Sequence, residues 1–254
     1  MDDSEKIWRN RFLELYRKAR QTSVPRFTDF LALPEKSLLL DLIQSGEIMD
    51  NETVLFGGFE GAEREMAGFG LEKDWDCREE FPLDILKISP LSEKFSDDLG
   101  HRDFLGALMN LGIERSSLGD IIVSGHEAYL CAVSRLSEYI SENLLTVKHT
   151  SVRCERLSGP VPGLCPVFEE KEIFLASERV DAVVARLTGD SRGRVTERFR
   201  KKEVFLNGRI TENSSSPLHA GDILTIRGLG KFIYDGPIRT TKKDRLLVRL
   251  RQYV

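Results

Sequence analysis

The stretch SRGRVTERFRKKEVFLNG, residues 191–208, decides how the C-terminal third of the chain folds. Val195 and Phe199 stand four residues apart among basic side chains, a spacing typical of a helix with one apolar and one cationic face. Ser191 is suited to cap this helix, which we expect over 192–202. The segment VFLNG that follows predicts a strand entering a tight Asn-Gly turn.

Further elements are predicted on both sides of this stretch. A helix is expected at about 178–187, because valines and leucines recur there at helical spacing and Ser177 precedes them as an N-cap. Strands are expected at 172–175 and 221–226. Together these elements predict a C-terminal domain, 172–254, that ends in a basic extension.

The charge of the chain is divided unevenly between this region and the rest. Residues 174–254 carry 17 Lys and Arg against 9 Asp and Glu, a net charge of +8, whereas the whole chain has a net charge of −4. Residues 1–173 are therefore acidic, at −12. A small basic block of this kind indicates a polyanionic partner such as nucleic acid. The alternative is a solvated helix face, although six cations beside one acid on the second helix would repel one another.

The rest of the chain predicts two more domains and a linker. Residues 1–78 are expected to form a mainly helical N-terminal domain. Residues 79–158 follow the order β-α-β-β-α-β, which predicts a split βαβ arrangement with two helices on one face of an antiparallel sheet. Residues 159–171 are rich in Pro and Gly and predict a linker. The fold class is thus α+β.

The glycine-rich segment 57–64 has two interpretations. It could cradle a phosphate, but it lacks the Lys-Ser/Thr pair of a P-loop and the spacing of a dinucleotide fingerprint. We expect instead a structural turn between a strand and a helix.

Other features predict neither a cofactor nor a metal. The four Cys form no CxxC pair and the four His have no metal-ligand spacing, so reduced thiols in a cytoplasmic protein are expected. The polar N-terminus is unlike a signal peptide, and the apolar runs are too short to span a membrane. We expect a monomer.

The C-terminal motifs together resemble the S-four RNA-binding domain. They are RVD at 179–181, SR at 191–192, the basic second helix, VFLNG at 204–208 and GDIL at 221–224. The resemblance implies a pair of helices (αL type) whose exposed face grips structured RNA. It departs from the family pattern at Gly193, Val195 and Glu203. The residues expected to bind RNA are Arg179, Ser191, Arg192, Arg194, Arg198, Lys201, Lys202 and Arg209.

Nearly the whole chain resembles the YlmH family of bacterial S-four proteins. The matching segments are PRFTDFL at 25–31, LFGGFEGAER at 55–64, HRDFLGALM at 101–109, GDI at 119–121, RGLGKF at 227–232 and TTKK at 240–243. The resemblance implies a helical N-terminal domain at 1–78, a middle domain at 79–158 similar to an RNA-recognition fold, and the S-four domain at 172–254. It also implies a link to the large ribosomal subunit and, in some members, to peptidyl-tRNA handling when translation stalls.

These observations predict a non-enzymatic protein that binds structured ribosomal or transfer RNA. The signature motifs of S-four tyrosyl-tRNA synthetases and pseudouridine synthases are absent from the sequence. The alternative is an RNA-modifying enzyme with its site at 57–64, where Glu60 and Glu63 would act. The middle domain has two possible roles, a scaffold or protein contact and direct stacking of RNA bases, because Tyr129 is the single aromatic residue of its expected central strands.

Overall fold

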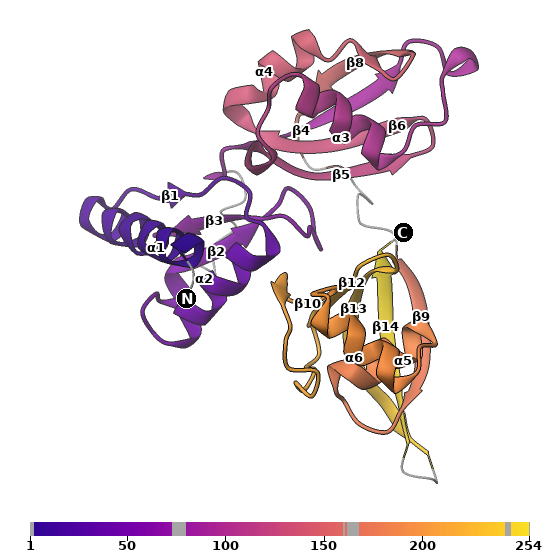
Figure 1. Ribbon diagram of the computed structural model, residues 1–254. Coiled ribbons are helices and arrows are strands. Elements are labelled where there is room, and N and C mark those ends of the chain that lie inside the picture. The colour runs from indigo at the N-terminus through magenta and orange to yellow at the C-terminus, as the bar shows by residue number, and fades with distance from the viewer. Residues whose placement is uncertain (1–2, 73–79, 160, 162–167, 242–244, 254) are drawn as a thin grey trace. The chain divides into compact units, whose positions relative to one another are not determined.

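The computed structural model describes residues 3–72, 80–159, 161, 168–241 and 245–253 of the 254-residue chain. The chain divides into two compact units, Met1–Pro166 and Val167–Val254. Both units combine helices with antiparallel sheets (Figure 1), which confirms the predicted α+β class. Among the described residues, no helix is both long enough and apolar enough to cross a membrane.

The first part of unit 1 places two helices beside a small sheet of strand order β1-β3-β2. Its elements are α1 (Asp3–Thr22), β1 (Arg26–Phe27), α2 (Leu33–Gln44), η1 (Asp50–Glu52), β2 (Thr53–Phe56) and β3 (Met66–Phe69). Phe12 and Tyr16 of α1 are buried as their helical spacing predicts, but Ile7 is 67% exposed near the start of that helix. Gly46 follows α2 with φ +77°, as expected for a residue that ends a helix.

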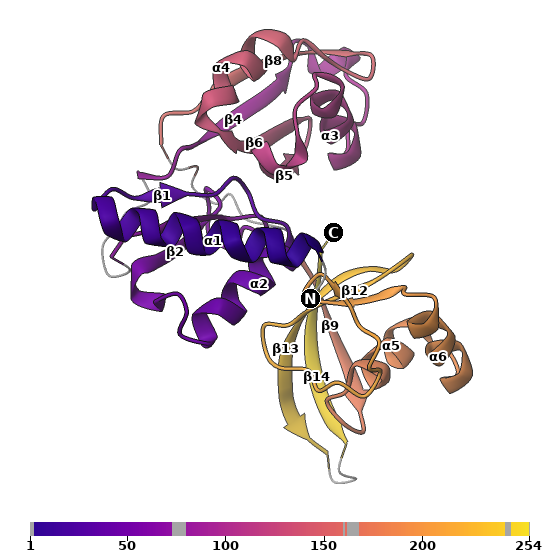
Figure 2. The ribbon, with the colours of Figure 1, turned by 60° about the vertical axis from the view of Figure 1, so that its left-hand side comes forward.

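The second part of unit 1 has the predicted β-α-β-β-α-β order. Its elements are β4 (Leu83–Pro90), η3 (Glu93–Phe95), α3 (His101–Asn110), η4 (Arg115–Ser117), β5 (Leu118–Ser124), β6 (Glu127–Val133), α4 (Ser134–Asn143), β7 (Thr146–Val147) and β8 (Thr150–Arg156). The sheet order is β5-β6-β4-β8-β7, all antiparallel. Helices α3 and α4 lie on one face of this sheet (Figure 2), where Phe104 and Ile140 pack against Leu86 and Leu130.

The opposite face of this middle sheet is covered in part by the N-terminal elements. Ile85 and Cys131, which point away from α3 and α4, share a buried cluster with Phe30, Met66 and Phe81. The two parts of unit 1 are therefore joined by a common core. The predicted boundary between 78 and 79 stays a prediction.

Unit 2 is a six-stranded antiparallel sheet of order β11-β10-β12-β13-β14-β9 with two helices on one face. Its elements are β9 (Phe168–Leu175), α5 (Val180–Thr188), α6 (Arg192–Arg200), β10 (Val204–Leu206), β11 (Arg209–Ile210), β12 (Ile223–Ile226), β13 (Gly230–Thr240) and β14 (Leu246–Tyr253). Asn207 and Gly208 make the expected turn, with φ +50° and +77°. The helices bury Val184, Val195 and Phe199 against the sheet.

Several expectations differ from the structure. The segment 57–64 joins the antiparallel strands β2 and β3, not a strand to a helix. Arg179, not Ser177, occupies the N-cap position of α5, and α6 ends at Arg200. The expected basic extension contains β13 and β14, the central hairpin of the sheet. Strand β9 begins at Phe168, within the expected linker, of which 160 and 162–167 lie outside the described residues.

Candidate nucleic-acid interface

Helix α6 presents a cationic face on unit 2. Val195 and Phe199 fix its orientation because both are buried in the core of the unit. The remaining positions point outward, so Arg192 and Arg194 are exposed in the first turn and Arg200 at the last residue. Gly189 ends α5 with φ +71°, which lets α6 follow within three residues.

The N-terminus of α6 carries positive charge where helices normally carry negative charge. Ser191 occupies the N-cap position with extended backbone, and its exposed side chain makes no capping hydrogen bond. The first turn contains no acidic residue. Free N–H groups and the helix dipole already favour an anion at this end, and Arg192 and Arg194 add to that field. The arrangement is unfavourable for the isolated helix and favourable for a bound phosphate.

Two of the expected RNA-binding arginines are committed to contacts within the protein. Arg198 donates from Nε to Asp190 at 2.7 Å and pairs with Glu203 at 3.2 Å. The Arg198 guanidinium lowers the pKa of Asp190. Arg179 makes a two-pronged contact with Asp181 at 3.0 and 2.7 Å, which raises the pKa of Arg179. These two side chains hold the ends of the helices in place.

The other expected residues are more accessible. Arg194 is 81% exposed and 4.0 Å from Asp190. Lys201 lies 3.6 Å from Glu197, and Lys202 lies 4.0 Å from Glu212, with side chains 58% and 61% exposed. Arg209 is half-buried in β11 and interacts with another group of the protein. The structure thus brings Arg192, Arg194, Lys201 and Lys202 to the surface of α6 and its C-terminal end.

The sequence prediction did not single out three nearby cations. Arg200 is 77% exposed and pairs with Glu197 at 2.7 Å, and Arg186 is exposed in the last turn of α5. Arg227 is exposed in the turn between β12 and β13, and its backbone N–H donates to the Glu203 carbonyl at 2.8 Å. The strand pairing of Val204 with Ile226 places this turn beside the end of α6. The position of Arg227 beside the end of α6 depends on pairing between strands that are distant in sequence, and the periodicity of a single helix cannot predict it.

The glycine-rich segment 57–64 forms a structural junction. The Asp120 carboxylate accepts hydrogen bonds from the backbone N–H groups of Glu63 at 2.6 Å and Arg64 at 3.3 Å. The Arg64 guanidinium in turn donates to the carbonyls of Leu118 and Phe30, each at 3.0 Å. Burial raises the pKa of Asp120.

The side chains of this segment and of nearby residues fit a structural role. A Cβ at Gly57 would lie 2.4 Å from the Arg64 carbonyl oxygen, so the turn requires glycine. Burial lowers the pKa of Arg115, which donates to Leu118 and Gly119, to about 10. Glu60, expected to act in the enzyme alternative, is exposed.

Thiols and metal ligands are not gathered into a site in the described part of the chain. Burial raises the pKa of Cys131, and it raises that of Cys154 to about 11, so neither is a thiolate at neutral pH. Cys77 and Cys165 lie outside the described residues. No group of three or more His, Cys, Asp or Glu within the described ranges could hold a metal ion.

The fold and this surface define a class: an α+β protein with a cationic helix on its C-terminal unit. A family model described as "Putative RNA-binding domain in YlmH" matches residues 77–159, the middle part of unit 1. The chain is 27% identical over 242 residues to the Bacillus subtilis (strain 168) "Ribosome-associated protein quality control protein P2", covering 95% of this chain and 92% of that protein. A solved structure, "Cell division protein ylmH from Streptococcus pneumoniae", shares 20% identity with a TM-score of 0.47, covering 62% of this chain and 93% of that one.

The resemblance to YlmH proteins that the sequence motifs indicated is thus confirmed by the family model and by the relative. The match of the family model falls on the split βαβ part of unit 1, and the relative from B. subtilis aligns along nearly the whole chain.

Proposed function

We propose that this protein is a ribosome-associated RNA-binding protein whose C-terminal unit is an S-four-type domain. In this proposal α6 binds structured ribosomal or transfer RNA through Arg192, Arg194, Lys201 and Lys202. The observation that carries the proposal is the exposed pair Arg192 and Arg194 at a helix N-terminus without an acidic residue in its first turn. Guanidinium groups make two-pronged contacts with phosphate, and helix N-termini favour anions.

The comparisons with known proteins also support a role in RNA binding at the ribosome. The family model names an RNA-binding domain, and the B. subtilis relative is named for ribosome-associated quality control. We propose from this that the protein acts as a monomer in the cytoplasm, with the large ribosomal subunit as its partner.

Unit 1 has a supporting role in this proposal. The face of its sheet that an RNA-recognition fold uses to stack bases is partly filled by Phe30, Met66 and Phe81. Tyr129 is partly buried against the same cluster, and the Lys87 ammonium lies 5.9 Å from its ring centroid and pairs with Glu127 at 2.8 Å. We therefore assign unit 1 a scaffold or protein-contact role.

A double charge reversal tests the site. Arg192→Glu with Lys201→Glu should abolish co-sedimentation with ribosomes while the protein stays folded, because both side chains are exposed and surface changes cost about 0.5 kcal/mol or less. The matched control is Arg11→Glu with Arg17→Glu, the same charge change at exposed positions of α1. Wild-type co-sedimentation of the α6 variant, or loss in the control, would contradict the assignment.

We further propose that RNA binding is not coupled to chemistry on the RNA. The segment 57–64 is occupied by contacts that hold unit 1 together, which supports this proposal. Mass spectrometry of ribosomal and transfer RNA from cells with and without the gene tests it. A modified nucleotide that purified protein reproduces, and that Glu60→Gln or Glu63→Gln abolishes, would establish an enzyme instead.

A further inference from the structure

The sheet of unit 2 has one face that its helices do not cover. The inner face supplies Leu224, Phe232, Tyr234, Val248 and Leu250 to the core beneath α5 and α6. Alternation along the strands places a different set on the outer face. From strand to strand these residues are Phe205, Ile223, Ile233, Lys231, Arg251, Tyr253 and Phe168.

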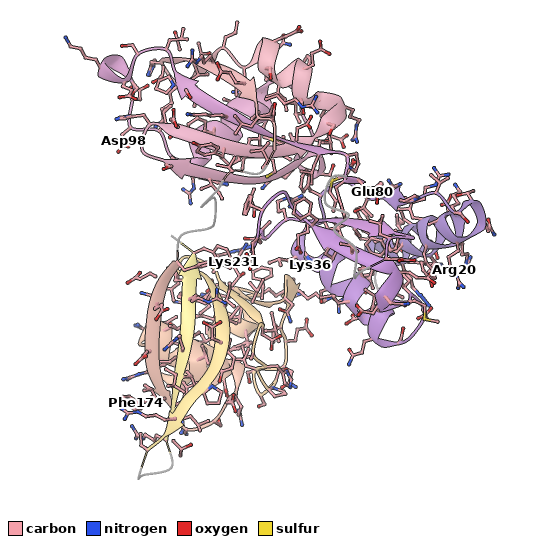
Figure 3. The ribbon with its side chains drawn as sticks, turned by 180° about the vertical axis from the view of Figure 1, so that it is seen from behind. Arg20, Lys36, Glu80, Asp98, Phe174 and Lys231 are labelled. Carbon is pink, nitrogen blue, oxygen red and sulfur yellow. The ribbon has the colours of Figure 1, made fainter. Side chains whose placement is uncertain are left out.

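An aromatic pair with two cations lies at one end of this outer face. Phe168 and Tyr253 are directly paired across β9 and β14, with ring centroids 4.9 Å apart and planes at 66°. The Lys231 ammonium lies 5.5 Å from the Tyr253 centroid, and the Arg251 guanidinium 5.0 Å from that of Phe168. Figure 3 views the sheet from this side, with Lys231 at one end and Phe174 toward the other.

Cations lie beside the aromatic rings at this end, and acidic side chains hold some of them in place. Asp235 holds Arg251 through contacts at 2.8 and 2.9 Å, so that pair is neutral and fixes the guanidinium over the Phe168 ring. Lys231 and Arg227 are further cations of this end. Glu170 pairs in register with Arg251 and so lies near the aromatic pair, and Glu170 and Glu172 are each 3.8 Å from Arg249.

The aromatic end of the sheet is linked by hydrogen bonds to the segment that follows α6. Glu203, directly after Lys201 and Lys202, accepts a hydrogen bond from the Arg227 backbone at 2.8 Å. The same turn is tied to β14, because the Gln252 amide donates to the Leu229 carbonyl at 3.3 Å. The turn at 227–229 therefore links the segment after α6 to the strands that carry Lys231 and Tyr253.

We infer that Phe168 and Tyr253 form a stacking site for an unpaired nucleobase of the RNA that α6 binds. The inference rests on the proposed function and adds the ligand class: structured RNA with an unpaired nucleotide next to the helix. Bases stack on aromatic rings and on guanidinium planes without demanding a particular sequence, and cations beside the rings attract the adjoining phosphates. The corresponding face of the middle sheet is partly filled by the N-terminal elements, whereas the outer face in unit 2 is not covered by α5 or α6.

Two labelled RNAs test this inference on the full chain. One is a blunt hairpin, and the other is the same hairpin with a short single-stranded extension at either end. The wild type should bind the extended hairpin more tightly, by roughly 5- to 150-fold for one stacked base. Tyr253→Ala should lose this gain and keep its affinity for the blunt hairpin. Tyr253→Phe, which keeps the ring, and Phe174→Ala, 41% exposed on the same face, should retain the gain.

A fluorescent base gives a second readout that does not depend on affinity. 2-Aminopurine in the extension should be quenched on binding to the wild type and not to Tyr253→Ala. The inference would be overturned if the wild type bound both hairpins equally and did not quench the base, which is the result expected if another protein or unit 1 covers this face. It would also be overturned if Tyr253→Ala kept the full gain in affinity for the extended hairpin. Failure of the proposed function would give a different result. In that case the wild type would bind neither hairpin, or the variant Arg192→Glu with Lys201→Glu would still bind the blunt hairpin.

Discussion

Residues of the same type have different roles on α6 and its neighbours. Arg194 is 81% exposed and only 4.0 Å from Asp190 at its closest, whereas Arg198 is held by Asp190 at 2.7 Å and by Glu203 at 3.2 Å. The sequence predicted that both would contact RNA. It could not separate them, because Asp190 precedes the helix and meets Arg198 after the chain turns at Gly189. The choice of Arg194 at 81% exposure over Arg198 at 28% depends on that turn.

The Arg198–Asp190 pair makes stability depend on pH. The folded protein lowers the pKa of Asp190 below the 3.8 of a free aspartate, so the pair stabilises the fold above that pH and the effect is lost as pH falls through the lowered pKa. Asp190→Asn should therefore unfold more easily than the wild type at neutral pH and equally at strongly acidic pH. Chemical denaturation across this range measures the difference. Glu212→Gln is the control, since Glu212 is 79% exposed and 4.0 Å from Lys202; a difference independent of pH would contradict the prediction.

Gly58 is a second residue whose identity the fold requires. Its φ is +100°, and a Cβ there would lie 2.6 Å from the Cys131 sulfur, on the middle sheet. Gly58→Ala should lower the free energy of unfolding by roughly 2–5 kcal/mol through backbone strain and overpacking. Gly46→Ala is the matched control, because its φ is +77° but no atom lies within 4 Å, and it should cost about 1–2 kcal/mol. Equal losses in both variants would show that Gly58 does not contact the middle sheet tightly.

The helices and strands in the middle part of unit 1 were predicted from the sequence more completely than those of unit 2. The strands and helices of the middle part follow local periodicity, and their β-α-β-β-α-β order appears in the structure as expected. Strands β13 and β14 were missed because basic residues in 227–251 obscured the alternation of Leu246, Val248 and Leu250 with outward-facing residues. Helix α6 was placed correctly at its start, and its end was overestimated since Lys202 adopts φ +56°.

The contribution of β14 to unit 2 can be tested by a pair of adjacent substitutions. Val248 is fully buried beneath the helices, so Val248→Asp places a charge in the core and should cost more than about 3 kcal/mol. Arg249→Ser changes the outer face, where the side chain is 42% exposed, and should cost about 0.5 kcal/mol or less. Limited proteolysis of the full chain would detect unfolding of unit 2. Equal resistance of both variants would show that β14 is dispensable.

At the scale of the whole molecule, charge is separated between the two units. Unit 2 as the structure defines it includes Glu169, Glu170 and Glu172 of β9, which the sequence-based division had placed in the acidic body. These acids lie at the edge strand, next to the arginines of β14 and at the other side of the sheet from β10 and β11. Net charge alone thus predicted a polyanion partner, and the structure shows which part of the unit concentrates the cations.

The salt dependence of RNA binding should report how many of these cations meet phosphate. If α6 and its neighbours neutralise about 4–6 phosphates, the logarithm of the binding constant should fall with that of salt concentration at a slope of about −3 to −5. Arg192→Glu with Lys201→Glu should reduce the magnitude of this slope by about 2 where residual binding can be measured, whereas Arg11→Glu with Arg17→Glu should leave it unchanged. Fluorescence anisotropy with the blunt hairpin, titrated at several salt concentrations, gives both slopes. An affinity that is constant between low and physiological salt would mean that the exposed arginines of α6 do not meet phosphate.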